Sequence, residues 1–235
     1  MNADWVDALR VVEAELSREK DSFALFGIFL PMEAGGQWDL VLAAPWARRD
    51  DRVVLEVIGD KIMRHLRTDI LRLARFVVVE TWHPGVQEIN SRFDIEHGLV
   101  SFTNEETFGY MAERALIITS KDYWRFVKQL FPANAQFTFS AREGDLIVRV
   151  SWLLNDDPSR PWKRSKNVMI SFTEESLALF ERDNRRETEL RLAAWLADQM
   201  KHHDPHHDAA EGEPPPTVRW RVTSTELQRP ALAVV

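Results

Sequence analysis

The densest group of potential metal ligands lies in the segment 202–208, which reads His-His-Asp-Pro-His-His-Asp and is followed by Glu211 and Glu213. Imidazole nitrogens and carboxylate oxygens suit zinc, nickel or iron, so one hypothesis is a metal-dependent hydrolase that uses this loop. Metal sites usually collect ligands from separate rigid elements, whereas these residues share one loop interrupted by a proline. We therefore favour a helix end followed by a solvated loop, and we expect no metal ligands and no cofactor.

The segment 160–166 combines four basic side chains with a tryptophan, a composition that suits nucleic-acid binding. Its candidate binding residues are Arg160, Trp162, Lys163, Arg164 and Lys166. Arginine and lysine pair with phosphates, and an exposed tryptophan stacks on a base of a single strand. In the alternative interpretation, Asp156 and Asp157 pair with these cations across the turn and Trp162 folds over the sheet. We favour this structural interpretation and keep nucleic-acid binding as an alternative function.

Motifs of the common catalytic classes do not occur in the chain. A restriction-type nuclease needs an acidic residue on one strand and Glu-x-Lys on the next, but neither Asp39 nor Glu80 is followed two positions later by lysine. The sequence also lacks a Walker loop, G-x-G-x-x-G and G-x-S-x-G. Adjacent carboxylates such as Glu105 and Glu106 point apart or into solvent, so they do not predict general acid–base catalysis. We assign no catalytic residue.

Aromatic residues concentrate near the start of the chain, at Phe23, Phe26, Phe29, Trp38 and Trp46. They could line an apolar pocket or meet another subunit. Core packing is the favoured interpretation, because a small module needs aromatic bulk to close its core.

Composition predicts a cytoplasmic protein that needs no membrane. The 235 residues include no cysteine, which excludes disulfides, thiolate zinc sites and cysteine nucleophiles and fits a reducing compartment. The first residues lack the basic and apolar regions of a secretory signal, and the longest apolar stretch, 23–32, is too short to span a bilayer.

The net charge of −7 is unevenly distributed along the chain. Residues 1–122 carry 21 acidic and 14 basic side chains, whereas residues 123–235 carry 16 of each. An acidic protein is poorly suited to nonspecific binding of duplex DNA, where affinity comes mainly from neutralising phosphates.

The pattern of apolar residues predicts an acidic first module over residues 1–122, in the order α-β-β-α-β-α-β-β. Trp5, Leu9, Val12 and Leu16 mark one face of a helix, and the apolar runs 23–30 and 38–43 indicate an antiparallel hairpin. The β-branched run 75–80 predicts a central strand buried on both faces. Pro84 predicts the start of a short helix, and strands are expected at 99–102 and 115–119.

A short junction, 123–134, is expected before a second module of order β-β-β-α-α-β over residues 135–227, with a tail at 228–235. Strands are expected at 135–141, 146–154, 167–172 and 218–222. Thr173 followed by two glutamates predicts a helix start, and Leu192, Trp195, Leu196 and Met200 form the apolar stripe of the next helix. The whole chain is therefore expected to be an α/β (α+β) protein of two consecutive modules, each a mixed or mainly antiparallel sheet covered by helices.

Residues 23–46, with Phe26-Gly-Ile-Phe-Leu-Pro31 and the run from Trp38 to Trp46, resemble the opening of uncharacterised bacterial proteins that have no assigned activity. The resemblance implies a bacterial origin and transfers no functional residue. Taken together, the sequence favours a noncatalytic binding or assembly protein whose partner is an unknown protein or a second copy of itself.

Overall fold

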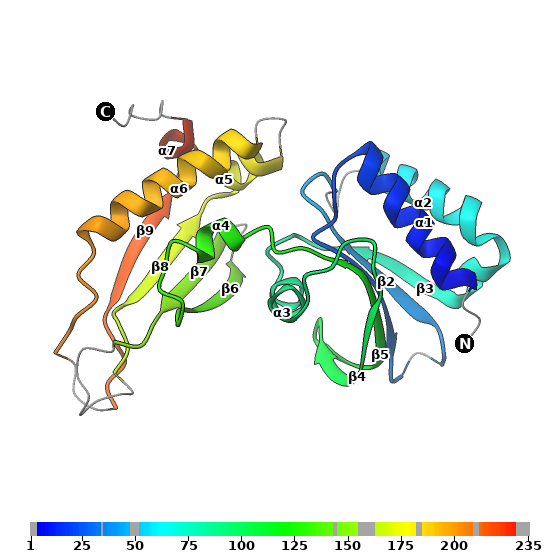
Figure 1. The fold of residues 1–235 in the computed structure, drawn as a ribbon, viewed down its shortest axis with the longest axis horizontal. Helices are drawn as coiled ribbons and strands as arrows, with labels where there is room; N and C mark the ends of the chain where they lie inside the picture. The colour runs from blue at the N-terminus through cyan, green and yellow to red at the C-terminus, as the bar shows by residue number, and fades with distance from the viewer. Residues whose placement is uncertain are drawn as a thin grey trace. The chain divides into compact units, whose positions relative to one another are not determined.

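The computed structural model describes residues 4–33, 35–47, 52–142, 145–154, 163–181, 185–208 and 212–228. The chain divides into two compact units, Met1–Tyr123 and Trp124–Val235, and each contains one mixed sheet with helices (Figure 1). The expected α/β class is therefore confirmed. Among the helices in these ranges, none has the length and apolar character needed to cross a bilayer.

Unit 1 has a five-stranded sheet of order β3-β2-β1-β5-β4, in which β2 and β3 are parallel and the other neighbours are antiparallel. Its elements are α1 (Asp4–Glu19), β1 (Leu25–Pro31), β2 (Trp38–Ala43), α2 (Arg52–Leu66), a 3₁₀ turn (Arg67–Arg72), β3 (Leu73–Val78), α3 (Pro84–Arg92), β4 (Val100–Thr107) and β5 (Tyr110–Ser120). The expected hairpin at the start of the chain corresponds to β1 and β2.

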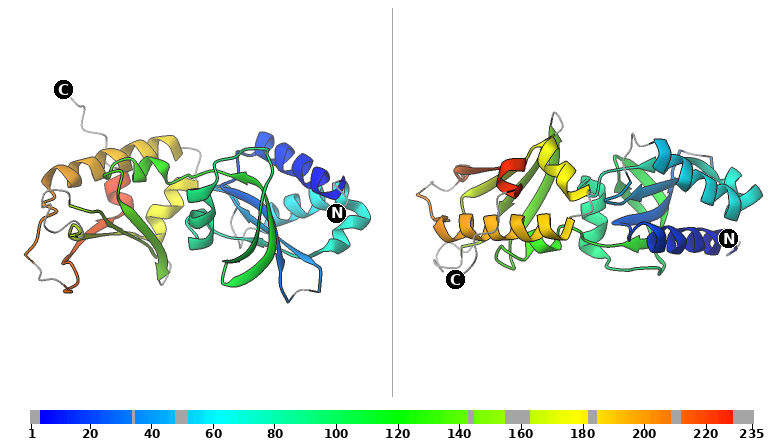
Figure 2. Two further views of the ribbon diagram at one scale, coloured as in Figure 1. Left: turned by 60° about the horizontal axis from the view of Figure 1, so that its bottom comes forward. Right: turned by 90° about the horizontal axis from the view of Figure 1, so that it is seen from above.

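Helices cover both faces of this sheet. α1 and α2 lie side by side on one face, while α3 packs on the other (Figures 1 and 2). Trp5, Leu9, Val12 and Leu16 are buried against the first face, as their helical spacing predicts. The aromatic residues of the first hairpin are distributed over the two core layers, which confirms that they pack in the core.

The expected position of the third strand is wrong. β3 lies at the edge of the sheet and pairs only with β2. Three of its residues are exposed, including Phe76 at 40%, and only Val78 is buried. A β-branched run signals a strand, but it does not reveal how many neighbours that strand has, because pairing is decided by contacts far apart in sequence.

Unit 2 has a four-stranded sheet of order β6-β7-β8-β9, with an antiparallel meander of three strands and β9 parallel to β8. The parallel connection runs through α5 and α6, and α6 lies along the sheet in every view (Figures 1 and 2). The elements are α4 (Arg125–Lys128), β6 (Gln136–Arg142), β7 (Asp145–Ser151), β8 (Asn167–Phe172), α5 (Glu174–Ala178), a 3₁₀ turn (Leu179–Glu181), α6 (Arg185–His202), β9 (Thr217–Val222) and α7 (Ser224–Gln228).

The helix start expected at Thr173 is confirmed, because the Thr173 side chain accepts a hydrogen bond from the backbone N–H of Ser176. On α6, Leu192 and Leu196 are buried, whereas Trp195 and Met200 are only half-buried. The apolar stripe expected for this helix is therefore narrower in the structure.

Trp124 joins the segment at the start of unit 2 to the core of that unit. Its ring is buried and lies 6.0 Å from the ring of Phe139, 5.4 Å from Phe172 and 6.1 Å from Phe180. Aromatic edge contacts of this kind add to the free energy gained by burying the ring.

We expect Trp124→Ala to lower the free energy of unfolding of unit 2 by about 3 to 5 kcal/mol, because it leaves a large cavity among aromatic rings. Urea denaturation followed by near-ultraviolet circular dichroism measures this loss. Gln129→Ala, at an exposed position of the same segment, is the control and should change stability by less than about 0.5 kcal/mol. Equal stability of the two variants would show that the segment is a linker outside the core.

Candidate functional site

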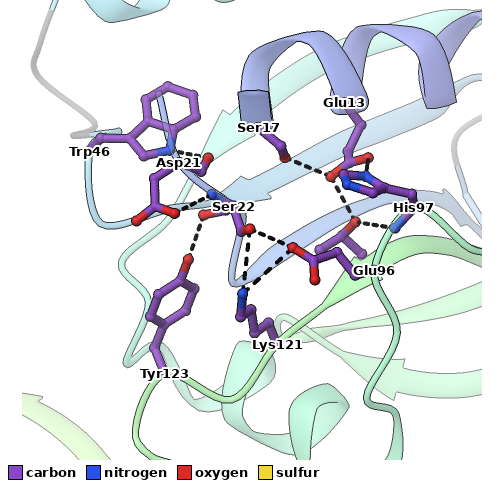
Figure 3. A network of polar contacts seen from close by, with 10 residues as sticks. Glu13, Ser17, Asp21, Ser22, Trp46, Glu96, His97, Lys121 and Tyr123 are labelled. Atoms are coloured by element: carbon purple, nitrogen blue, oxygen red, sulfur yellow. Dashed lines mark hydrogen bonds and ion pairs between the residues drawn. The ribbon is translucent and has the colours of Figure 1, made fainter. Parts of the chain in front are cut away.

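The carboxylate of Glu13, on α1, is the centre of a polar network at one end of the unit 1 sheet (Figure 3). Glu13 is fully buried, and its Oε1 accepts hydrogen bonds from Ser17 Oγ at 2.9 Å and Thr119 Oγ1 at 2.8 Å. Nδ1 of His97 lies 2.5 Å from Oε2 and carries the proton, because a carboxylate can only accept. The buried charge is thus fully satisfied, and it ties α1 to β5 and to the segment before β4.

A second group of contacts joins the start of β1 to the end of β5 (Figure 3). Ser22 Oγ donates to Glu96 Oε1 at 2.5 Å, and Lys121 Nζ donates to Ser22 Oγ at 3.4 Å. The Tyr123 hydroxyl donates to the Ser22 carbonyl at 2.7 Å. The hydrogen bond from Ser22, and then the charge of Lys121, lower the pKa of Glu96 against the opposing effect of its burial.

The pair of Glu13 and His97 has the form of a catalytic carboxylate–histidine dyad, in which the acid orients the imidazole. Ser22, however, donates its hydroxyl proton to Glu96, so it is not arranged as a nucleophile activated by His97. We therefore assign the network around Glu13 and Ser22 a structural role.

A cleft of about 430 Å³ opens between the N-terminus of α3 and the turn that joins β4 to β5. One wall comes from the helix and the other from the turn, and the lining residues are His83, Pro84, Gly85, Glu88, Glu106, Thr107, Phe108 and Gly109. This volume lies within the range of small-molecule binding pockets.

The imidazole of His83 is fixed in one tautomer by the start of α3. Pro84 occupies the first turn of the helix, where its missing N–H costs nothing, and the next N–H, of Gly85, donates to His83 Nδ1 at 3.1 Å. Burial lowers the pKa of His83, so the ring is neutral near pH 7 and its proton resides on Nε2. Nε2–H has no hydrogen-bond acceptor among the described residues and is therefore available to a ligand.

The ring of Phe108 forms the apolar part of the cleft wall. It stacks on His83 with centroids 5.3 Å apart and meets Phe29 edge-on at 5.2 Å. A Cβ atom at Gly85 would lie 2.8 Å from Cδ1 of Phe108, so only glycine allows the ring to approach the helix this closely.

Three oxygen-bearing side chains of the cleft remain unpaired within the described ranges. Glu88 and Glu106 are exposed and form neither an ion pair nor a hydrogen bond there through their carboxylates. Thr107 is only 4% exposed, and its Oγ1 is buried without a hydrogen-bond partner. Arg92, one helical turn after Glu88, forms a bidentate ion pair with Glu105 instead, which lowers the pKa of Glu105.

Three of the five residues predicted to bind nucleic acid, Lys163, Arg164 and Lys166, are described by the structure and lie just before β8. Arg164 donates to the hydroxyl and carbonyl oxygens of Ser151 at 3.0 and 2.8 Å, and Lys166 lies 3.4 Å from Asp204. Lys163 accepts a backbone hydrogen bond from Leu154. Arg160 and Trp162 lie outside the described residues, as do Asp156 and Asp157. Arg164 and Lys166 thus have intramolecular partners, and nucleic-acid binding stays a prediction.

The histidines of the segment 202–208 contact separate partners. His203 packs edge-on against Trp152 and Trp220, with centroids 5.7 and 5.5 Å away, while His207 Nε2 lies 2.9 Å from the Arg164 carbonyl. In the parts of the chain that the structure describes, which exclude Glu211, no three His, Asp or Glu residues are placed to hold a metal ion. The described geometry therefore offers no support for the hydrolase hypothesis.

Asp39, which the sequence singles out as an acid on a strand, is paired with Arg75. The carboxylate is buried and accepts hydrogen bonds from Arg75 Nε at 3.0 Å and Nη2 at 2.9 Å, which links β2 to the edge strand β3. Burial, together with the charge of Asp39, raises the pKa of the nearby Tyr110 to about 12. Asp39 therefore has the contacts of a structural ion pair.

The cleft was not predicted from the sequence. The expected strands stop at 102 and resume at 115, whereas β4 continues to Thr107 and β5 begins at Tyr110, so the turn of Phe108 and Gly109 lies where the sequence predicts no element. One usable signal was present: histidine before proline at a helix start can cap the helix with its ring nitrogen. No protein-family model, curated protein or solved structure matches the chain.

Thr119→Val should lower the free energy of unfolding of unit 1 by about 1 to 3 kcal/mol, because it removes a hydrogen bond to the buried Glu13 carboxylate while keeping the shape of the side chain. Urea denaturation measures the change. Thr103→Val, at an exposed position on β4, should change stability by less than about 0.5 kcal/mol. If both variants are as stable as the natural protein, Glu13 does not depend on this hydrogen bond.

Stability should fall below about pH 6.5, and His203 should contribute to the fall. Burial, and then the charge of Lys166, lower the pKa of His203, although Asp204 opposes the shift. The folded protein binds a proton at His203 less readily than the unfolded chain does. The neutral His203 ring therefore contributes its full stabilisation above the ordinary pKa of histidine, and this contribution is lost as the pH falls towards the lower pKa of His203 in the folded protein.

His203→Phe keeps an aromatic ring between Trp152 and Trp220 but cannot titrate, so its unfolding free energy should decrease less between about pH 7 and pH 5. Ala194→Ser, at an exposed position of α6 without a titratable side chain, is the control and should keep the natural pH dependence. An unchanged slope in His203→Phe would exclude His203 as a source of the acid sensitivity.

Proposed function

We propose that the protein is a noncatalytic binding protein and that the cleft at α3 is its ligand-binding site. The observation that carries the proposal is that the residues lining one cavity include four polar groups without a hydrogen-bond partner among the described residues: His83 Nε2–H, the carboxylates of Glu88 and Glu106, and the hydroxyl of Thr107. Buried polar groups in folded proteins normally have partners, and a ligand would supply one to Thr107. Trp5 Nε1 is also buried without a partner, but Trp5 does not line the cleft.

The hydrogen bonding of His83 supports binding over acid–base catalysis. A general base needs a nitrogen that is free to accept a proton. In His83 the accepting nitrogen, Nδ1, is already used by the Gly85 N–H, so protonation there would break the cap of α3. His83 is thus suited to donate one hydrogen bond of fixed direction.

The walls of the cleft also support binding, because the helix start and the turn that form them are held in place by neighbouring structure. His83 and Glu88 are held by α3, and Thr107 ends β4. Phe108, in the turn, is packed between Phe29 and His83. A preorganised site loses less conformational freedom when a ligand binds.

The cellular location and the origin of the protein are proposed from its composition and from residues 23–46. We propose a cytoplasmic location, since a chain without cysteine fits a reducing compartment, and a bacterial origin, since residues 23–46 resemble bacterial proteins. A binding protein of two compact units can join a ligand on one unit to a protein partner, or a second copy, on the other.

The proposal predicts that small molecules bind at the cleft. A set of cationic, anionic and neutral fragments should include members that shift the backbone amide NMR signals of residues 83, 85–88 and 106–109 in the ¹⁵N-labelled full-length protein. Gly85→Ala should abolish these shifts, because the added methyl group collides with Phe108 and moves a wall of the cleft.

Gly98→Ala is the matched control, since its Cβ would meet no atom closer than 3.7 Å. It should leave fragment binding unchanged. A screen in which no fragment of any charge shifts these amides, or in which Gly85→Ala binds as well as Gly98→Ala, would contradict the proposal.

A further inference from the structure

We infer that the ligand of this cleft carries an ammonium or guanidinium group, as a free amine or as the side chain of a lysine or arginine residue in a peptide. The inference rests on the proposed function, and it names the chemistry of the ligand. Three observations carry it: the charge of the cleft, the acceptors that it offers and the ring beside them.

The residues that line the cleft include two carboxylates and no lysine or arginine. Glu88 and Glu106 contribute two carboxylates, and His83 is neutral near pH 7 because it is buried. Neither carboxylate has a cation within ion-pair distance among the described residues. Two like charges facing one cavity repel each other, and a bound cation removes that repulsion while an anion would increase it.

Arg92 cannot supply this cation without breaking other contacts. Its guanidinium forms the bidentate pair with Glu105 and lies over the rings of Phe93 and Phe102, each at 5.1 Å from the ring centroid. The pair with Glu105, and to a smaller degree the charge of Glu88, raise the pKa of Arg92, so Arg92 is close enough to feel Glu88 but forms its ion pair with Glu105. The carboxylates of Glu88 and Glu106 therefore have no ion-pair partner among the described residues.

The acceptors in the cleft match a group with several N–H donors. Thr107 lines the cleft at 4% residue exposure, and its Oγ1, which has no partner among the described residues, can accept a hydrogen bond from a donor that reaches it, in addition to those accepted by the two carboxylates. An ammonium offers three donors and a guanidinium five. Phe108 also lines the cleft, and the part of its ring that His83 and Phe29 leave uncovered can contact the alkyl chain of the ligand. A metal ion fits less well, because the described residues contain no set of three side-chain ligands for one.

His83 distinguishes the two sources of the cation. Its Nε2–H is a donor, so it matches an oxygen atom rather than the cation itself. A residue in a peptide brings a carbonyl oxygen a few bonds from its charged end, whereas a simple amine does not. Peptide-borne arginine or lysine should therefore bind more tightly than agmatine or butylamine.

The test titrates the ¹⁵N-labelled protein with blocked dipeptide mimics, N-acetyl-arginine methylamide and N-acetyl-lysine methylamide, and with agmatine and butylamine. N-acetyl-citrulline methylamide is the neutral isostere of the arginine probe. We expect the cationic probes to shift the amides of residues 85–88 and 106–109, and the citrulline probe to bind at least about tenfold more weakly, since a charge-assisted hydrogen bond is lost.

Glu88→Gln and Glu106→Gln should each weaken the arginine probe by about tenfold and leave the melting temperature nearly unchanged, because both side chains are exposed. Glu113→Gln, at an exposed position of β5 outside the cleft, should change affinity by less than about twofold. Equal binding of the arginine and citrulline probes, or equal effects of the three substitutions, would overturn the inference.

The outcomes separate this inference from the proposed function. If neutral or anionic fragments bind at the cleft and the cationic probes do not, the cleft is a binding site and the assigned ligand chemistry is wrong. If no probe of any charge binds there, both are wrong. Tighter binding of agmatine than of the peptide mimics would show that the ligand is a free amine. It would also contradict the hydrogen bond expected from His83 Nε2–H to a peptide carbonyl oxygen.

Discussion

The ring of Phe108 packs so closely on α3 that any side chain at position 85 would collide with it. This contact brings the turn between β4 and β5 against the start of the helix, although the two lie about twenty residues apart in the sequence. It also places the ring of His83 under Phe108, where burial keeps the imidazole neutral. The cleft therefore depends on one apolar contact that fixes both of its walls.

The carboxylates of the cleft differ from the buried carboxylates elsewhere in unit 1, because the buried ones are paired. The buried carboxylate of Glu13 has three donors, and that of Asp39 has a bidentate arginine. Burying a charge is costly unless it is paired, so these two residues stabilise the fold only together with their partners. In the cleft, by contrast, two carboxylates and a buried hydroxyl have no partner within the described residues, which is the arrangement expected where a ligand completes the pairing.

Much of the fold could be predicted from the sequence because local patterns decide it. The spacing of Trp5, Leu9 and Val12 identified α1, and Thr173 followed by acidic residues identified the start of α5. The edge position of β3 could not be predicted, since its valines indicate a strand but not its neighbours. Residues 103–114 were also missed, because the polar run before Phe108 has the composition of a loop.

The candidate site could not be predicted for a related reason. His83 and Thr107 come together only through packing, and no spacing in the sequence links them. The segments 160–166 and 202–208 stand out in composition, yet their described residues contact other residues of the same unit. β1 and β2 supply no residue that lines the cleft, although Phe29 of β1 packs against Phe108 in its wall.

In the proposed complex, a cation lies beside Phe108 and donates hydrogen bonds to Thr107 and the two glutamates. Intermolecular nuclear Overhauser effects between the side-chain methylene protons of N-acetyl-arginine methylamide and the labelled protein test it most directly. The account predicts contacts to the ring protons of Phe108 and the methyl group of Thr107. Contacts confined to other parts of the protein, with saturating probe present, would contradict it.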